Sequence, residues 1–251
     1  MARHTSEAIV NRQYQVRIGQ YIRDGWAIFT TNAVGYIGFL FLLIFISYIS
    51  CISINMIIGI VIFWLLQAGS YFVGFKITHG QRPEFESFFN GFKGNYFLPI
   101  ILTNLVSVLI ICSFIILAFF FFIVASKVYP DMETLHKLQL ILVLLLRLIL
   151  VLLGSVFLLA GLYFAVSYTF AIPLVVEHKF DFWSAMETSR HLISRNWFSF
   201  FLFSLTILLI NVLGLCLCCV GLLVTVPLST CVIVAAYRDI IGLNPSNSHD
   251  S

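Results

Sequence analysis

The sequence predicts an all-α polytopic membrane protein with six transmembrane helices, arranged as three hairpins that each follow a short amphipathic interfacial helix. Three observations predict this fold. Hydrophobic residues make up 61% of the 251 residues and charged residues only 10%, whereas soluble domains carry roughly 25% charged residues. Four apolar blocks are long enough to cross a bilayer, which takes roughly 20 helical residues. Most basic residues fall on one side of the resulting topology.

The lengths of the four apolar blocks decide how each one folds. The blocks span 33–75, 96–125, 138–173 and 197–237. As single helices, the first and last would reach about 60 to 65 Å, twice the roughly 30 Å hydrocarbon core. Each of these two must therefore fold back as a hairpin. The turns are expected at 53–55 and 218–221, where small residues and glycine permit a tight reversal.

The two middle blocks are single spans, joined by a loop at 126–137 that contains Pro130 and several charges. The count is six spans, so both termini share one side. The positive-inside rule then predicts a multi-pass protein of the cell inner membrane with both termini in the cytoplasm. Eleven of the fourteen Lys and Arg residues fall on that side: Arg3, Arg12, Arg17, Arg23, Lys76, Arg82, Lys93, Lys179, Arg190, Arg195 and Arg238.

One integral membrane domain is expected over residues 1–251. It would carry a polar cytoplasmic segment at 1–17 and a short cytoplasmic tail at 243–251. No cleavable signal peptide is visible, because the first 32 residues are polar and the first apolar run begins too late to be a signal-peptide core.

A repeated pattern precedes the hairpins. The segments 22–32, 85–95 and 186–196 each end in an asparagine (Asn32, Asn95, Asn196) that is followed by a long apolar stretch. Their apolar residues recur at helical spacing, which predicts three short amphipathic helices on the cytoplasmic surface. The asparagine is expected to cap the following span. Chance similarity between unrelated interfacial helices is the alternative. The expected apolar stripes are Ile18, Tyr21, Ile22, Trp26 and Phe29; Phe85, Phe88, Phe89 and Phe92; and Trp183, Met186, Ile193 and Trp197.

Three stretches together resemble a known family. They are "FESFFNGFKGNY" (85–96), "AIPLVVEHKFDFWSAMETSRHLISRNW" (171–197) and "VGLLVTVPLSTCVIVAAYRDIIG" (220–242). They are similar to the YciC-like bacterial inner-membrane proteins, also labelled the membrane domain of glycerophosphoryl diester phosphodiesterase. The resemblance implies a six-helix membrane unit of unknown activity, fused in some relatives to a phosphodiesterase barrel. Nine residues follow Gly242 and a barrel needs about 250, so we expect no catalytic residue to carry over.

Arg147 is the only charged residue inside an apolar block. An ion at the bilayer centre costs about 2.5–3.5 kcal/mol on insertion scales, and such residues often mark function. Arg147 would then bind an anionic lipid headgroup or substrate from the outer leaflet. The alternative is that 148–173 forms the span and that the guanidinium snorkels to the outer interface.

Asn104 and Asn211 are the other candidate site residues, since both place an amide within a span. Helix-to-helix hydrogen bonding is the default role for such a group, and the alternative is that they line a solute pathway. Pro99, Pro173 and Pro227 are expected to kink or end spans near the interface.

Two further groups are expected to be structural. The six cysteines all lie in apolar segments and match no zinc framework, so they are interpreted as small packing residues; they are Cys51, Cys112, Cys216, Cys218, Cys219 and Cys231. Glu187 and His191, with Glu177 and His178 upstream, could form a metal site or an acid–base pair. A solvated helix face is the simpler interpretation, so no metal site is expected.

The sequence says little about activity. No Asp or Glu falls within a span, which disfavours transport coupled to membrane carboxylates, and motifs for phosphate binding, zinc proteolysis and serine hydrolysis are absent. We therefore expect a non-enzymatic protein without catalytic residues or cofactors. Its partners would be membrane lipids and a membrane protein or a second copy of this chain, not nucleic acid. A small transporter or channel for an uncharged or anionic solute is the alternative, and a membrane-embedded lipid enzyme is the third.

Overall fold

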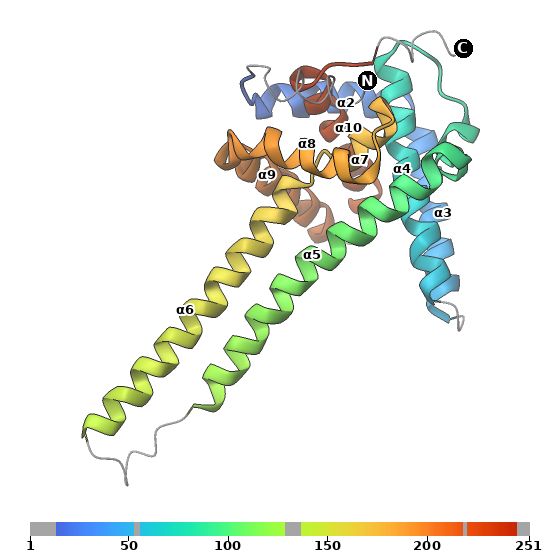
Figure 1. The fold of residues 1–251 in the computed structure, drawn as a ribbon. Helices are drawn as coiled ribbons and strands as arrows, with labels where there is room; N and C mark the ends of the chain where they lie inside the picture. Colours follow the sequence, from blue (N-terminus) through green and yellow to red (C-terminus); the bar gives the residue numbers. More distant parts are fainter. Residues whose placement is uncertain (1–13, 53–55, 129–136, 218–219, 245–251) are drawn as a thin grey trace. The chain divides into compact units, whose positions relative to one another are not determined.

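The computed structural model of this protein describes residues 14–52, 56–128, 137–217 and 220–244, excluding the side chains of 50–52, 56 and 138 (Figure 1). The regular elements of this part of the chain are all helical. In chain order they are α2 (Ile18–Thr31), α3 (Ala33–Ile52), α4 (Met56–Thr78), the 3₁₀ helix η1 (Phe85–Phe92), α5 (Gly94–Lys127), α6 (Lys137–Ser167), α7 (Ala171–His178), α8 (Phe182–Ser194), α9 (Trp197–Cys216) and α10 (Leu222–Ile240).

The predicted fold class is confirmed. Five helices in the described part are long and apolar enough to cross a membrane, and α3, which meets α2 at an 85° bend, accounts for a sixth. With 20 residues, α3 reaches about 30 Å and can cross by itself. The spans pair as α3 with α4, α5 with α6, and α9 with α10. A short amphipathic helix (α2, η1 or α8) precedes each pair. The protein is an all-α polytopic membrane protein.

The third apolar block remains one candidate span, as predicted, but its helix is interrupted. It was expected to be one span over 138–173, but α6 ends at Ser167, a turn occupies 168–170, and α7 begins at Ala171. Within a continuous helix, Pro173 would clash with the carbonyl of Thr169 and break a backbone hydrogen bond. The turn instead places Pro173 in the first turn of α7, where its missing N–H costs nothing. Pro99 and Pro227 lie inside α5 and α10.

Two of the predicted turns lie partly or wholly outside the described residues. The turn at 53–55 is outside, as are positions 218–219 of the last turn and most of the loop at 126–137, Pro130 included. The described ends of that loop are helical, since α5 continues to Lys127 and α6 begins at Lys137.

The asparagine repeat is visible in the backbone at two of its three positions. Asn32 (φ −142°, ψ 44°) and Asn196 (φ −132°, ψ 42°) share one conformation between a short helix and a span. In the middle copy the break falls at Lys93, and Asn95 lies inside α5. Asn196 makes no side-chain cap, so the predicted capping role is wrong there. These residues mark a change of direction, with the backbone carbonyls of Asn32, Lys93 and Asn196 starting the next helix.

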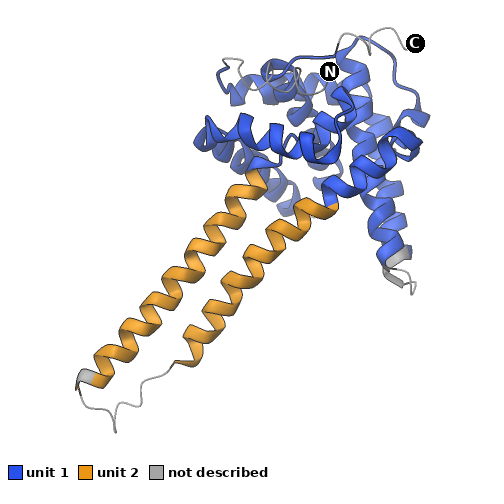
Figure 2. Cartoon of the chain, in the orientation of Figure 1, with its two compact units in different colours: residues 1–104, 167–251 blue, residues 105–166 orange. Residues whose placement is uncertain are grey.

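The chain divides into two compact units, residues 1–104 with 167–251 and residues 105–166 (Figure 2). Helix α5 contributes to both, changing unit after Asn104. The expectation of one integral membrane domain over the whole chain stays a prediction.

The larger unit is held together by close helix contacts. Helix α2 packs on α10, and a Cβ on Gly25 would lie only 2.6 Å from a Val232 side-chain carbon. Helix α4 packs as tightly on η1, because a Cβ on Gly69 would meet the Phe88 carbonyl oxygen at 1.9 Å and one on Gly91 would meet the Leu65 carbonyl oxygen at 2.6 Å. Small residues of this kind permit close approach between membrane helices.

Aromatic and polar contacts complete this unit. Phe88 is fully buried and stacks on Phe39 at 4.2 Å between ring centroids. At the end where α2 meets α10, Arg238 pairs with Asp24 at 2.8 Å and the Tyr21 hydroxyl donates to Asp239 at 3.0 Å. The α2–α10 pair is therefore fixed by packing along its length and by charge at its polar rim.

The expected apolar stripes are only partly right. The buried face of α2 is Tyr21, Gly25, Ile28 and Phe29, while Trp26 is half exposed, because α2 packs on the protein and not only on lipid. In η1 the 3₁₀ geometry repeats every three residues, so the buried row contains Phe88 and Gly91, and Phe92 is exposed.

The smaller unit, 105–166, is a helical hairpin with few buried side chains. Stacked aromatic pairs join its two helices, Phe114 with Phe164 and Phe121 with Phe157. Most of its large apolar side chains are exposed. Exposure of this kind suits helices that face lipid.

Candidate functional site

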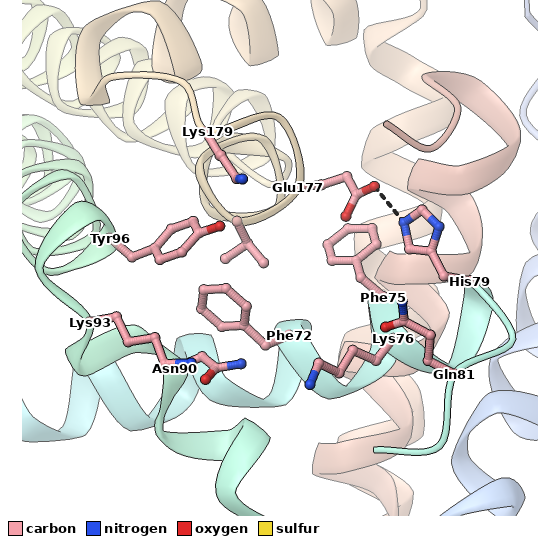
Figure 3. A pocket seen from close by; sticks show the side chains of 11 residues that line it. Phe72, Phe75, Lys76, His79, Gln81, Asn90, Lys93, Tyr96, Glu177 and Lys179 are labelled. Carbon is pink, nitrogen blue, oxygen red and sulfur yellow. Dashed lines mark hydrogen bonds and ion pairs between the residues drawn. The ribbon is translucent and has the colours of Figure 1, made fainter. Parts of the chain in front are cut away.

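One pocket of the larger unit has a volume of about 210 Å³ and is lined by three lysines (Figure 3). The lysines come from separate segments: Lys76 from the end of α4, Lys93 from the link between η1 and α5, and Lys179 from the link after α7. The chain has five lysines in total, so more than half of them meet at this pocket. The remaining lining residues are Phe72, Phe75, His79, Gln81, Asn90, Tyr96, Val176 and Glu177.

Helix α4 supplies one wall of this lysine pocket. Phe72, Phe75, Lys76 and His79 follow the i, i+3, i+4, i+7 spacing that places side chains on one helix face. The two rings are buried and form an apolar floor, while the Lys76 ammonium group donates to the Ser87 hydroxyl at 3.1 Å. Helix α4 stops just beyond, where Gly80 adopts a positive φ of 77°, the conformation typical of a helix C-terminus. The α4 wall is therefore apolar at its base and cationic at its rim.

Lys179 has an unusual backbone. It caps the C-terminus of α7 in the left-handed region (φ 55°, ψ 36°), and it is the only residue other than glycine with positive φ in the described part of the chain. That position normally holds glycine, because a Cβ there costs about 1–2 kcal/mol. Its exposed side chain reaches the pocket (Figure 3). A lysine is thus kept at the rim of the pocket despite backbone strain.

A buried acidic residue closes one side of the pocket. Glu177 is 2% exposed, and its Oε1 lies 2.8 Å from His79 Nε2. The same oxygen accepts from the backbone N–H of Asn244 at 2.8 Å. Figure 3 shows Glu177 turned toward His79. His79 and Asn244 already bind this carboxylate. It therefore offsets the positive charge of the three lysines less than a carboxylate facing them alone would.

The pocket is suited to an anion with an apolar portion. Three ammonium groups provide strongly hydrated point charges that phosphate and carboxylate attract. Asn90 and Tyr96 add neutral hydrogen-bonding groups, and Phe72, Phe75 and Val176 offer apolar contact below them. A His–Glu pair is also the arrangement that orients a general base. However, the eleven lining residues include no Ser, Thr or Cys for such a base to activate.

The sequence anticipated part of this site. The sequence predicts that Lys76, Lys93 and Lys179 all lie on the cytoplasmic side, but it does not predict that they meet at one pocket. His79 was missed, since its partner Glu177 is 98 residues away and no spacing motif connects them. Aromatic and basic residues at helical spacing near the end of α4 were the available signal.

The sequence groups two histidines with two glutamates, but in the structure they do not form one site. Nδ1 of His178 lies 2.6 Å from the Tyr237 hydroxyl. Glu187 pairs with Arg190 at 2.6 Å and with His191 at 2.8 Å, and all three side chains are at least 31% exposed. The hydrogen bond from Arg190 lowers the pKa of Glu187 below its ordinary value of 4.5. This group has the character of a solvated helix face.

The three candidate residues named from the sequence have different surroundings. Asn211 Nδ2 donates to Ser229 Oγ across the α9–α10 pair at 2.7 Å. Asn104 Nδ2 donates within α5 to the Ile100 carbonyl at 3.0 Å and also lines a second, smaller cavity. Arg147 belongs to the other compact unit, where it is the eleventh residue of α6. From Arg147 to Ser167 the helix measures about 30 Å, so a span ending near Ser167 would place Arg147 at the opposite interface.

Three cysteines of the described part are free thiols: Cys231 is buried, whereas Cys112 and Cys216 are exposed. Cys218 and Cys219 lie outside the described residues, as does the side chain of Cys51. Across the described ranges, no group of three His, Cys, Asp or Glu side chains could hold a metal ion.

Comparison with protein-family models, with curated proteins and with solved structures found no match for this chain. The resemblance to the YciC-like proteins stays a prediction that depends on 85–96, 171–197 and 220–242.

Proposed function

We propose that this multi-pass membrane protein is non-enzymatic and binds the headgroup of an anionic phospholipid in the lysine pocket. The convergence of Lys76, Lys93 and Lys179 above an apolar floor supports this function. A phospholipid carries the matching chemistry, with a phosphate that attracts the ammonium groups and acyl chains that contact Phe72 and Phe75. The protein would accompany an envelope process by holding such lipids.

The position of the pocket along the spans favours a membrane lipid over a soluble anion. Lys76 is in the last turn of α4, and Lys93 immediately precedes α5. Lysines at the ends of spans are expected at the headgroup region, and both belong to the side predicted to be cytoplasmic. Basic residues at that surface gain about 1 kcal/mol each from anionic lipids.

Aromatic side chains on the short helices support contact with the membrane surface. Trp26 on α2, Phe85 and Phe92 on η1, and the Trp183 ring on α8 are between 42% and 60% exposed. Aromatic rings of this kind favour the membrane interface. Each short helix thus offers an apolar contact beside the polar end of a hairpin.

Lipid titration by native mass spectrometry tests this function. We expect the purified protein to retain phosphatidylglycerol in preference to zwitterionic phosphatidylcholine. The variant Lys93→Gln/Lys179→Gln should weaken phosphatidylglycerol binding about 30-fold, since two lysines contribute about 2 kcal/mol. Lys76 is left intact because it hydrogen-bonds to Ser87.

The matched control is Lys127→Gln/Lys137→Gln, which removes the same charge from the two lysines outside the pocket. Equal weakening in both variants would refute the site. Displacement of the lipid by millimolar inorganic phosphate would show that the pocket recognises phosphate alone. Headgroup release by wild-type protein that is absent in His79→Gln would contradict a non-enzymatic role.

A further inference from the structure

A second cavity in the larger unit has different chemistry. Its volume is about 150 Å³, and it is lined by Trp64, Gln67, Ala68 and Tyr71 of α4, Asn104 of α5, and Tyr168, Thr169 and Ile172 around the start of α7. All eight residues belong to the same compact unit. None of the eight carries a charge, and six of them have a hydroxyl, an amide or an indole N–H.

The depth of Gln67 makes this cavity unusual. Gln67 is the twelfth of the 23 residues of α4, so about 17 Å of helix lies on either side. Its side chain is exposed, whereas the neighbouring Leu65, Leu66 and Ala68 are buried. An amide at mid-span is costly unless it finds a hydrogen-bonding partner.

Two polar groups of the cavity have unused hydrogen-bonding capacity. Within the described part of the chain, the side chains of Gln67 and Tyr71 make no hydrogen bond to another residue. A polar group left unsatisfied away from water costs about 1–3 kcal/mol, so a polar molecule that hydrogen-bonds to Gln67 and Tyr71 would stabilise the unit.

We propose that this cavity binds a small uncharged polyol. The lining residues offer no charge to pair with an ion, which favours an uncharged ligand. Amides can donate to and accept from hydroxyl groups, and the rings of Trp64, Tyr71 and Tyr168 offer faces for C–H contact. At roughly 30 Å³ per water, the cavity holds the equivalent of about five waters, which suits a molecule the size of glycerol. This site is independent of the lysine pocket.

Fluorine NMR of the protein labelled with 5-fluorotryptophan tests the proposal with glycerol as the probe. The chain has four tryptophans, so Trp64 reports on the cavity while Trp26 and Trp183 report on bulk solvent effects. We expect the Trp64 resonance to shift saturably with glycerol. A linear shift shared with Trp26 and Trp183 would overturn the proposal and indicate a cavity that holds water alone.

Two matched asparagine variants locate the site. Asn104→Leu removes a cavity amide, and Asn211→Leu removes a span amide that bonds to Ser229 instead. Asn104→Leu and Gln67→Leu should each lower the glycerol affinity about tenfold, with Asn211→Leu within twofold of wild type. Equal affinity in Asn104→Leu and Asn211→Leu would refute the site. Glycerol binding should persist in Lys93→Gln/Lys179→Gln, and its loss there would also contradict this assignment.

Discussion

The two compact units bury very different shares of their apolar helices. In the larger unit, half of the most apolar stretch of α4 and of α10 is buried, and 17% of that of α9. The corresponding stretches are 11% buried in α5 and 6% buried in the span that contains α6. Helices α5 and α6 are nevertheless the more hydrophobic. Lipid tails are as apolar as leucine, so hydrophobicity alone does not bring membrane helices together. Close packing and polar contacts do so, and the larger unit has more of both.

The larger unit therefore carries the features that need fixed geometry. The lysine pocket, the polar cavity and the strained residue Lys179 all lie in it. The hairpin at 105–166 leaves most of its large apolar side chains exposed. If this comparison is right, a substitution in the larger unit should lower the free energy of unfolding more than a matched substitution in the hairpin.

The largest difference is expected for matched phenylalanine truncations. Phe88→Ala should lower the free energy of unfolding by about 3–5 kcal/mol, because Phe88 is fully buried against Phe39. Phe121→Ala removes a ring stacked on Phe157 at 5.5 Å and should cost only about 1 kcal/mol, since lipid can fill the space. Denaturant titration in mixed micelles, followed by far-UV circular dichroism, measures both. Similar losses of unfolding free energy in the two variants would contradict the difference between the two units.

Matched glycine substitutions should show the next largest difference. Gly69→Ala should cost about 3 kcal/mol, because its Cβ would overlap the Phe88 backbone carbonyl. Gly154→Ala, in the hairpin, should cost only about 1 kcal/mol. Its Cβ would lie 2.9 Å from the movable Phe122 ring and 3.2 Å from the Ala118 carbonyl oxygen, so the neighbours need to shift by only a few tenths of an ångström.

The control for both glycines is Gly38→Ala, where a Cβ meets nothing within 4 Å. No loss of stability is expected there. The same denaturant titration applies, and a Gly69→Ala protein as stable as Gly38→Ala would show that α4 and η1 are not tightly packed.

Substitutions of Lys179 test whether the larger unit keeps a strained backbone conformation that places a lysine at the pocket. Lys179→Gly should raise the free energy of unfolding by about 1 kcal/mol, because glycine adopts positive φ without a Cβ clash. Lys179→Gln keeps the strain and should leave stability nearly unchanged. Phosphatidylglycerol binding should weaken equally in both variants. Unchanged stability in Lys179→Gly would mean that φ relaxes without cost.

The smallest expected effect concerns the exposed rim of α8. Arg190 lowers the pKa of Glu187 in the folded protein, so the pair stabilises the fold above the unfolded value of about 4.5 and loses this contribution as the pH falls through the folded pKa. Solvent screening limits the effect to about 0.5 kcal/mol. Unfolding measured between pH 3 and 7 should show a smaller acid-side loss for Glu187→Gln than for wild type. An identical pH dependence would contradict this assignment.

The main architecture was predictable from local features of the chain. The bilayer thickness obliges the apolar blocks at 33–75 and 197–237 to fold back, which yields six spans. The short helices before the hairpins follow from apolar residues at helical spacing. Both inferences use only residues close in sequence, so composition and periodicity sufficed.

The site could not be predicted in the same way. His79 and Glu177, or Gln67 and Asn104, are partners or neighbours only because separate helices pack together, and no periodicity links them. The close approach of η1 to α4 at Gly69 and Gly91 likewise has no counterpart in the periodicity of either segment. The sequence by itself determined which segments cross the membrane, because lipid acts on each segment alone. Only the tertiary structure decided which polar groups meet, because that depends on close contacts between segments far apart in the chain.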